Sequence, residues 1–92
     1  MLREGDVAWL PVDTMYSSRQ ARRKGNSAGL VWNAERERPV RIVGLDVSPY
    51  GFGLYADFVV LEEGPPVMGN THVENLEPMA DVEALAYTSW EE

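Results

Sequence analysis

Proline and glycine divide the chain into short apolar segments, and this spacing limits the possible fold more than any other feature of the sequence. The two longest segments, 40–47 and 54–61, flank the turn Ser48-Pro49-Tyr50-Gly51-Phe52-Gly53. Two strands joined by a turn that contains glycine and proline are most simply a β-hairpin. The run 58–61 is apolar at every position, which indicates a strand covered on both faces. We therefore expect a mainly β protein with this hairpin at its centre.

Shorter strand candidates lie on both sides of the hairpin. Segment 5–11 reads as a turn, a strand and a proline stop, with Val7 and Trp9 on one face and Ala8 and Leu10 on the other. Trp9, Trp32 and Phe58 are expected in the core. The remaining expected elements are short strands at 30–32, 67–68 and 76–78 and one helical turn over 71–75.

The length of 92 residues allows one domain. We expect this domain over residues 1–79, followed by a C-terminal helix or tail over 80–92. An apolar stripe at helical spacing indicates the helix; it consists of Val82, Leu85, Ala86, Ser89 and Trp90. Trp90 is expected to hold the helix against the domain, or the helix forms a homodimer contact.

Residues 11–29 show no strand pattern and predict a long polar loop after the first strand. Loops of this length are typically functional or mobile. Within the loop, residues 18–24 suit a very short helix, because Ser18 can cap its start and Gly25 can follow its end.

Charge is distributed unevenly along the chain, whose net charge is −7. Residues 1–41 hold all eight cations and five acidic residues, a net charge of +3. Residues 42–92 hold ten acidic residues and no cation, a net charge of −10. Net repulsion therefore opposes binding of DNA or an anionic membrane by the whole surface, although a local basic element can still bind an anion.

Three phrases resemble those of Src-homology-3-like barrels, including Tudor- and KOW-type modules: 5–9 (Gly-Asp-Val-Ala-Trp), 39–43 (Pro-Val-Arg-Ile-Val) and 72–78 (His-Val-Glu-Asn-Leu-Glu-Pro). In these families a G-D-x-V opening starts the first strand, and a helical turn ending in x-x-L-x-P closes the barrel. The resemblance spans residues 5–78 and implies a small five-stranded barrel to which the C-terminal helix is added. Because this barrel serves many unrelated binding tasks, the resemblance implies no particular function.

The sequence offers little catalytic chemistry. Without cysteine, the chain has no disulfide, no thiolate metal site and no cysteine nucleophile. His72 is the one histidine, and with Glu74 it makes no zinc or two-metal signature. His72 is also the sole candidate base for a serine or threonine nucleophile. We expect no enzyme, no metal and no cofactor, and interpret His72 as a polar residue of a helical turn.

No apolar run approaches the ~20 residues that span a bilayer. The first six residues, Met-Leu-Arg-Glu-Gly-Asp, do not resemble a signal peptide. We therefore expect a cytoplasmic protein that has no membrane partner.

The candidate partner-binding residues are Tyr16, Arg19, Arg22, Arg23, Lys24, Tyr50 and Phe52. In a helix Arg19 shares a face with Arg22 and Arg23, which suits phosphate or an acidic partner. The alternative is a solvated loop whose cations balance the acidic half of the chain. Tyr50 and Phe52 lie in a tight turn where burial is difficult, so they either anchor a partner or pack over one end of the barrel.

We expect a non-enzymatic protein-binding module that uses loop 11–29 and the Tyr50-Phe52 turn. The small size of the chain, its excess of acidic residues and its use of arginine in preference to lysine resemble those of bacteriophage accessory proteins. Such proteins bind and modulate a host protein. One alternative is a nucleic-acid-associated module that contacts phosphate through residues 19–24. The other is an acidic inhibitor that mimics DNA, which the −10 half suggests.

Overall fold

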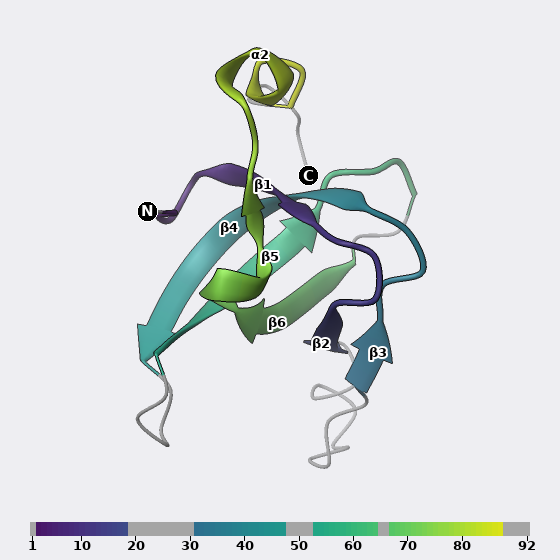
Figure 1. Ribbon diagram of the computed structural model, residues 1–92, viewed down its shortest axis with the longest axis vertical. Helices are drawn as coiled ribbons and strands as arrows, with labels where there is room; N and C mark the ends of the chain where they lie inside the picture. Colours follow the sequence, from purple (N-terminus) through teal and green to yellow (C-terminus); the bar gives the residue numbers. More distant parts are fainter. Residues whose placement is uncertain (1, 19–30, 48–52, 65–66, 88–92) are drawn as a thin grey trace.

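The computed structural model describes residues 2–18, 31–47, 53–64 and 67–87 (Figure 1). In this part of the chain, η1 (Val73–Asn75) is a 3-10 turn and α2 (Asp81–Ala84) is a short helix, as expected for the C-terminal region. The strands form one antiparallel sheet in the order β3-β2-β6-β5-β4-β1-β7. They are β1 (Val7–Leu10), β2 (Met15–Ser18), β3 (Val31–Asn33), β4 (Arg38–Val47), β5 (Leu54–Val60), β6 (Met68–His72) and β7 (Glu77–Pro78).

The mainly β class is confirmed, but the five-stranded closed barrel is wrong. The sheet is open, with β3 and β7 at its edges and no pairing between them in the described residues. Six strands have three or more residues, and β7 has two. The prediction missed β2, since residues 11–29 were interpreted as a loop. Strand β2 pairs with both β3 and β6, and in this way the sheet extends beyond β6.

Strand β2 also changes the expectation of a helix over 18–24. Ser18 ends β2 rather than beginning a helix, and residues 19–24 lie outside the described part of the chain.

The central hairpin is confirmed. Strands β4 and β5 pair from Val40 opposite Val60 to Val47 opposite Leu54. The register shifts between Ile42 and Gly44, a bulge of the kind that bends a strand and increases its twist. Strand β4 can therefore pair with β1 near its start and follow β5 along the rest of its length.

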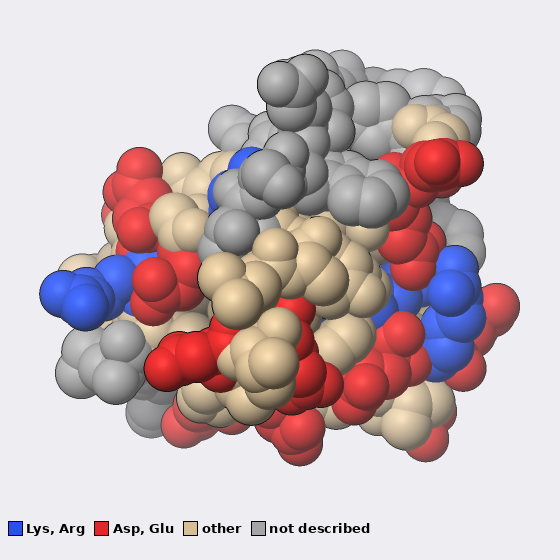
Figure 2. All heavy atoms as spheres, turned by 90° about the horizontal axis from the view of Figure 1, so that it is seen from above, with Lys and Arg blue, Asp and Glu red and all other residues tan. Residues whose placement is uncertain are grey.

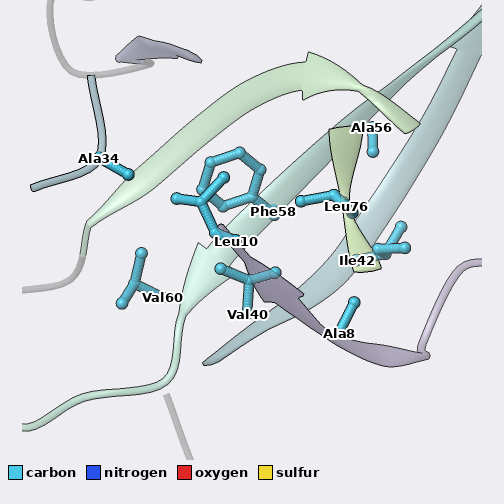
Figure 3. Close-up of a cluster of buried hydrophobic side chains, with 9 residues drawn as sticks. All are labelled: Ala8, Leu10, Ala34, Val40, Ile42, Ala56, Phe58, Val60 and Leu76. Carbon is cyan, nitrogen blue, oxygen red and sulfur yellow. The ribbon is translucent and has the colours of Figure 1, made fainter. Parts of the chain in front are cut away.

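The first core cluster lies on the inner face of the curled sheet, where Figure 3 shows side chains from several strands pointing toward Phe58. Phe58, Leu10 and Ile42 are fully buried. Leu76 comes from the segment between η1 and β7 and packs into the same cluster. The remaining members are Ala8, Ala34, Val40, Ala56 and Val60.

A second core cluster lies on the other face of β1 and β5, as the apolar run 58–61 predicted. Val7, Val59 and Leu61 are buried there beneath Met79. The C-terminal segment covers this face through Ala84 and Tyr87, which pack against the cluster. Strand β5 is thus covered on both sides near its end, with Phe58 and Val60 in the first cluster and Val59 in the second.

The apolar stripe expected to dock the C-terminal helix is wrong for its first three positions. Val82 and Leu85 are 77% and 72% exposed and Ala86 is also exposed, because Ala84 and Tyr87 contact the second cluster instead. Trp90 lies outside the described residues. Trp9 is half-buried, and its ring meets the ring of Tyr87 edge-on at a centroid distance of 5.9 Å.

Candidate functional site

A hollow of about 290 Å³ opens between β2, the start of β5, the end of β6 and η1. Three aromatic residues, one methionine and two small polar residues make up most of its lining, and we call it the aromatic hollow. These residues are Met15, Tyr16, Tyr55, Thr71, His72 and Asn75.

The antiparallel register positions the rings of the aromatic hollow. Tyr55 on β5 lies opposite His72 on β6, and their rings stack with centroids 4.2 Å apart and planes 30° apart. Tyr16 is half-buried, and its ring packs edge-on against Phe58 at 5.8 Å. Aromatic pairs of these geometries add stability beyond their buried area. The walls of the hollow are therefore held by contacts that exist without a ligand.

Hydrogen bonds hold the polar part of the lining. The Thr71 hydroxyl donates to the Met15 carbonyl oxygen at 2.9 Å and accepts from Asn75 Nδ2 at 3.1 Å. Thr71 itself is 3% exposed. Beside it, Asn70 Nδ2 donates to Asp57 Oδ1 at 2.9 Å. Thr71 thus links β2 to η1 beside the hollow.

Thr71→Val is expected to lower the free energy of unfolding by about 2 kcal/mol, because the isosteric side chain leaves the Met15 carbonyl and the Asn75 amide without their buried partner. Urea denaturation measures the change. Thr71→Ser is the control: it keeps the hydroxyl and loses one buried methyl group, at about 1 kcal/mol. If the valine variant is as stable as the serine variant, these hydrogen bonds do not hold the hollow.

Of the residues predicted to bind a partner, only Tyr16 lies in the described part of the chain. It lines the aromatic hollow, and whether it contacts a partner stays a prediction. Arg19, Arg22, Arg23, Lys24, Tyr50 and Phe52 lie outside the described residues. The phosphate-binding alternative and the predictions for the Tyr50-Phe52 turn therefore also stay predictions.

Tyr55, His72 and Asn75 were not predicted to belong to one site. His72 ends β6 instead of belonging to a helical turn, which begins one residue later at η1. Tyr55 and His72 are separated by 16 intervening residues and meet only through the pairing of β5 with β6. A usable signal existed for Tyr55. Side chains alternate in direction along a strand, so Tyr55 lies on the face opposite Phe58.

Among the described residues, no three histidine or carboxylate side chains gather in a way that suits a metal ion. No helix in the same ranges has the length and hydropathy required to cross a membrane.

Comparison with protein-family models, with curated proteins and with solved structures finds no match for this chain.

Proposed function

We propose that this chain is a non-enzymatic protein-binding module whose aromatic hollow receives an apolar side chain from an extended segment of a partner protein. The observation that carries the proposal is the stacked pair of Tyr55 and His72 beside the hydrogen-bonded Thr71 and Asn75. A site that is already held in shape loses less conformational entropy on binding.

The rim of the aromatic hollow supports this function. Met15 is 61% exposed at its edge, although its carbonyl oxygen is held by Thr71. Methionine is unbranched and polarisable, so it adapts to differently shaped partners. Tyrosine is enriched among the residues that dominate binding energy at protein interfaces. Met15 thus offers a flexible rim, and Tyr16 and Tyr55 belong to the rigid walls.

The resemblance to Src-homology-3-like modules, without the closed barrel, remains part of the proposal. In its support, β1 begins directly after Gly5-Asp6, and one residue, Leu76, separates η1 from Glu77–Pro78. The short last strand then pairs with β1. If the chain is phage-encoded, as its composition suggests, we propose that the partner is a host protein whose activity it modulates.

The test begins with a random peptide library selected on the wild-type chain. The affinity of the selected peptides is then measured by calorimetry for wild type, Met15→Asp and Val82→Asp. Both substitutions place one carboxylate at an exposed apolar position, but Val82 lies on α2, away from the aromatic hollow.

Met15→Asp is expected to weaken binding about tenfold or more, equivalent to about 1.4 kcal/mol. Val82→Asp is expected to bind like wild type. Selected peptides that bind both variants as tightly as wild type would show that the aromatic hollow is not the site.

A further inference from the structure

A second hollow, of about 550 Å³, lies near the far end of β5 from the aromatic hollow. Tyr55 near the start of β5 lines the first hollow, and Leu61 directly after β5 lines the second. Six residue positions along a strand span about 20 Å, so the two hollows are separate surfaces. We call the second one the acidic hollow, after the glutamates at its rim.

The wall of the acidic hollow is aromatic and is built from opposite ends of the described chain. Trp9 on β1 and Tyr87 after α2 meet edge-on with ring planes 80° apart, and both rings are half-buried. The Arg41 guanidinium donates to the Tyr87 carbonyl oxygen at 3.0 Å, which ties the C-terminal segment to β4. The backbone of Tyr87 is therefore held in place beside the aromatic pair.

Carboxylates dominate the rim of this hollow. Glu37, Glu62 and Glu63 line it together with one cation, Arg36. Arg36 is already bound to Glu62 at 3.0 Å. Glu37 and Glu63 are exposed, and neither has an ion-pair partner among the described residues. Figure 2 shows the same excess more broadly, with Asp and Glu spread more widely than Lys and Arg over the face seen there.

We propose that the acidic hollow is a second docking surface, whose occupant is an arginine-containing basic segment of a partner protein. A guanidinium group stacks on aromatic rings and donates fork-shaped hydrogen bonds to carboxylates. Trp9 and Tyr87 supply the rings, and Glu37 and Glu63 supply the carboxylates. Charge complementarity selects a basic segment and disfavours an acidic one or nucleic acid, which the rim repels.

The surface gives the protein a second point of attachment. Because the two hollows are about 20 Å apart, one segment in each can be held at the same time. The chain can then bridge two partners, or hold two segments of one partner.

The test uses the acetylated peptide Arg-Gly-Arg-Gly-Arg and its citrulline counterpart, which has the same shape without the charge. Each is titrated into the isotopically labelled full chain at low salt, and amide and indole resonances are followed by NMR. The arginine peptide is expected to shift the Trp9 indole N–H and the Tyr87 amide, and the citrulline peptide is expected to leave both unchanged.

Matched variants distinguish binding at the acidic hollow from general electrostatic attraction to an acidic protein. The double variant Glu37→Gln, Glu63→Gln is expected to lower the affinity for the arginine peptide about tenfold. This loss lies within the energy that two exposed ion pairs contribute. Glu4→Gln with Glu74→Gln changes the net charge equally at exposed positions outside this hollow and is expected to retain wild-type affinity within about twofold. Equal weakening by both pairs, or shifts centred on the aromatic hollow, would overturn the second surface while leaving the first proposal standing.

Discussion

Phe58→Ala is expected to lower the free energy of unfolding by about 3–5 kcal/mol, the largest effect of any substitution considered. Phe58 is fully buried and is the largest such side chain in the described residues. It lies at the centre of the first core cluster, to which β1, β4 and the segment after η1 all contribute. Its removal leaves a cavity that several elements would have to fill together.

Urea and thermal denaturation measure this loss, which is a large share of the roughly 5–15 kcal/mol that stabilises a typical protein. Phe58→Leu is the control, since it retains most of the apolar volume and is expected to cost less than about 1.5 kcal/mol. Equal losses for the two variants would show that the volume of Phe58 is not what stabilises the core.

Gly69→Ala is expected to be destabilising by about 1–3 kcal/mol through overpacking. A Cβ atom at this position would lie 2.6 Å from Phe58 Cζ and 2.9 Å from Tyr16 Cδ2. Both neighbours are rings, and Tyr16 also lines the aromatic hollow, so the added methyl group changes the site as well as the stability. Peptide affinity is expected to fall together with the free energy of unfolding.

Gly44→Ala, on strand β4, is the matched control. A Cβ atom there would make only ordinary contacts with Asp57, at 3.5 Å or more. Its stability is expected to equal that of wild type or to rise by about 0.4–1 kcal/mol, because alanine restricts the unfolded chain. If Gly69→Ala is as stable as Gly44→Ala, the close approach of Tyr16 and Phe58 does not depend on glycine.

The hairpin of β4 and β5 could be predicted because its information is local. The two long apolar segments and the turn between them, which contains glycine and proline, together identify a hairpin. The run 58–61 also predicted that both faces of β5 are covered, and Phe58 and Val59 do lie in different core clusters.

Strand β2 could not be predicted from local pattern. Met15-Tyr16-Ser17-Ser18 has weak apolar alternation, and its partners are β3 and β6, far away in the sequence. The sheet extends beyond β6 through this strand, which the predicted barrel lacked. The apolar stripe at the C-terminus also led to a wrong prediction, because Tyr87 packs against Trp9 and Val82 is exposed.

The two hollows depend on register and could not be derived from spacing. Tyr55 reaches His72 only because β5 and β6 pair with one particular alignment. Trp9 and Tyr87 lie near opposite ends of the chain. Pairings of this kind are decided by tertiary packing, which a single sequence does not reveal.

Chemical-shift mapping of a peptide selected on the wild-type chain is the most direct test of the binding-module proposal. The peptide is titrated into the labelled chain, and the shifts are compared between the two hollows and the exposed face of α2. We expect the largest shifts at Met15, Tyr16, Tyr55 and His72, with α2 unaffected. Saturable binding whose shifts leave these four residues unchanged would contradict the aromatic hollow as the binding site.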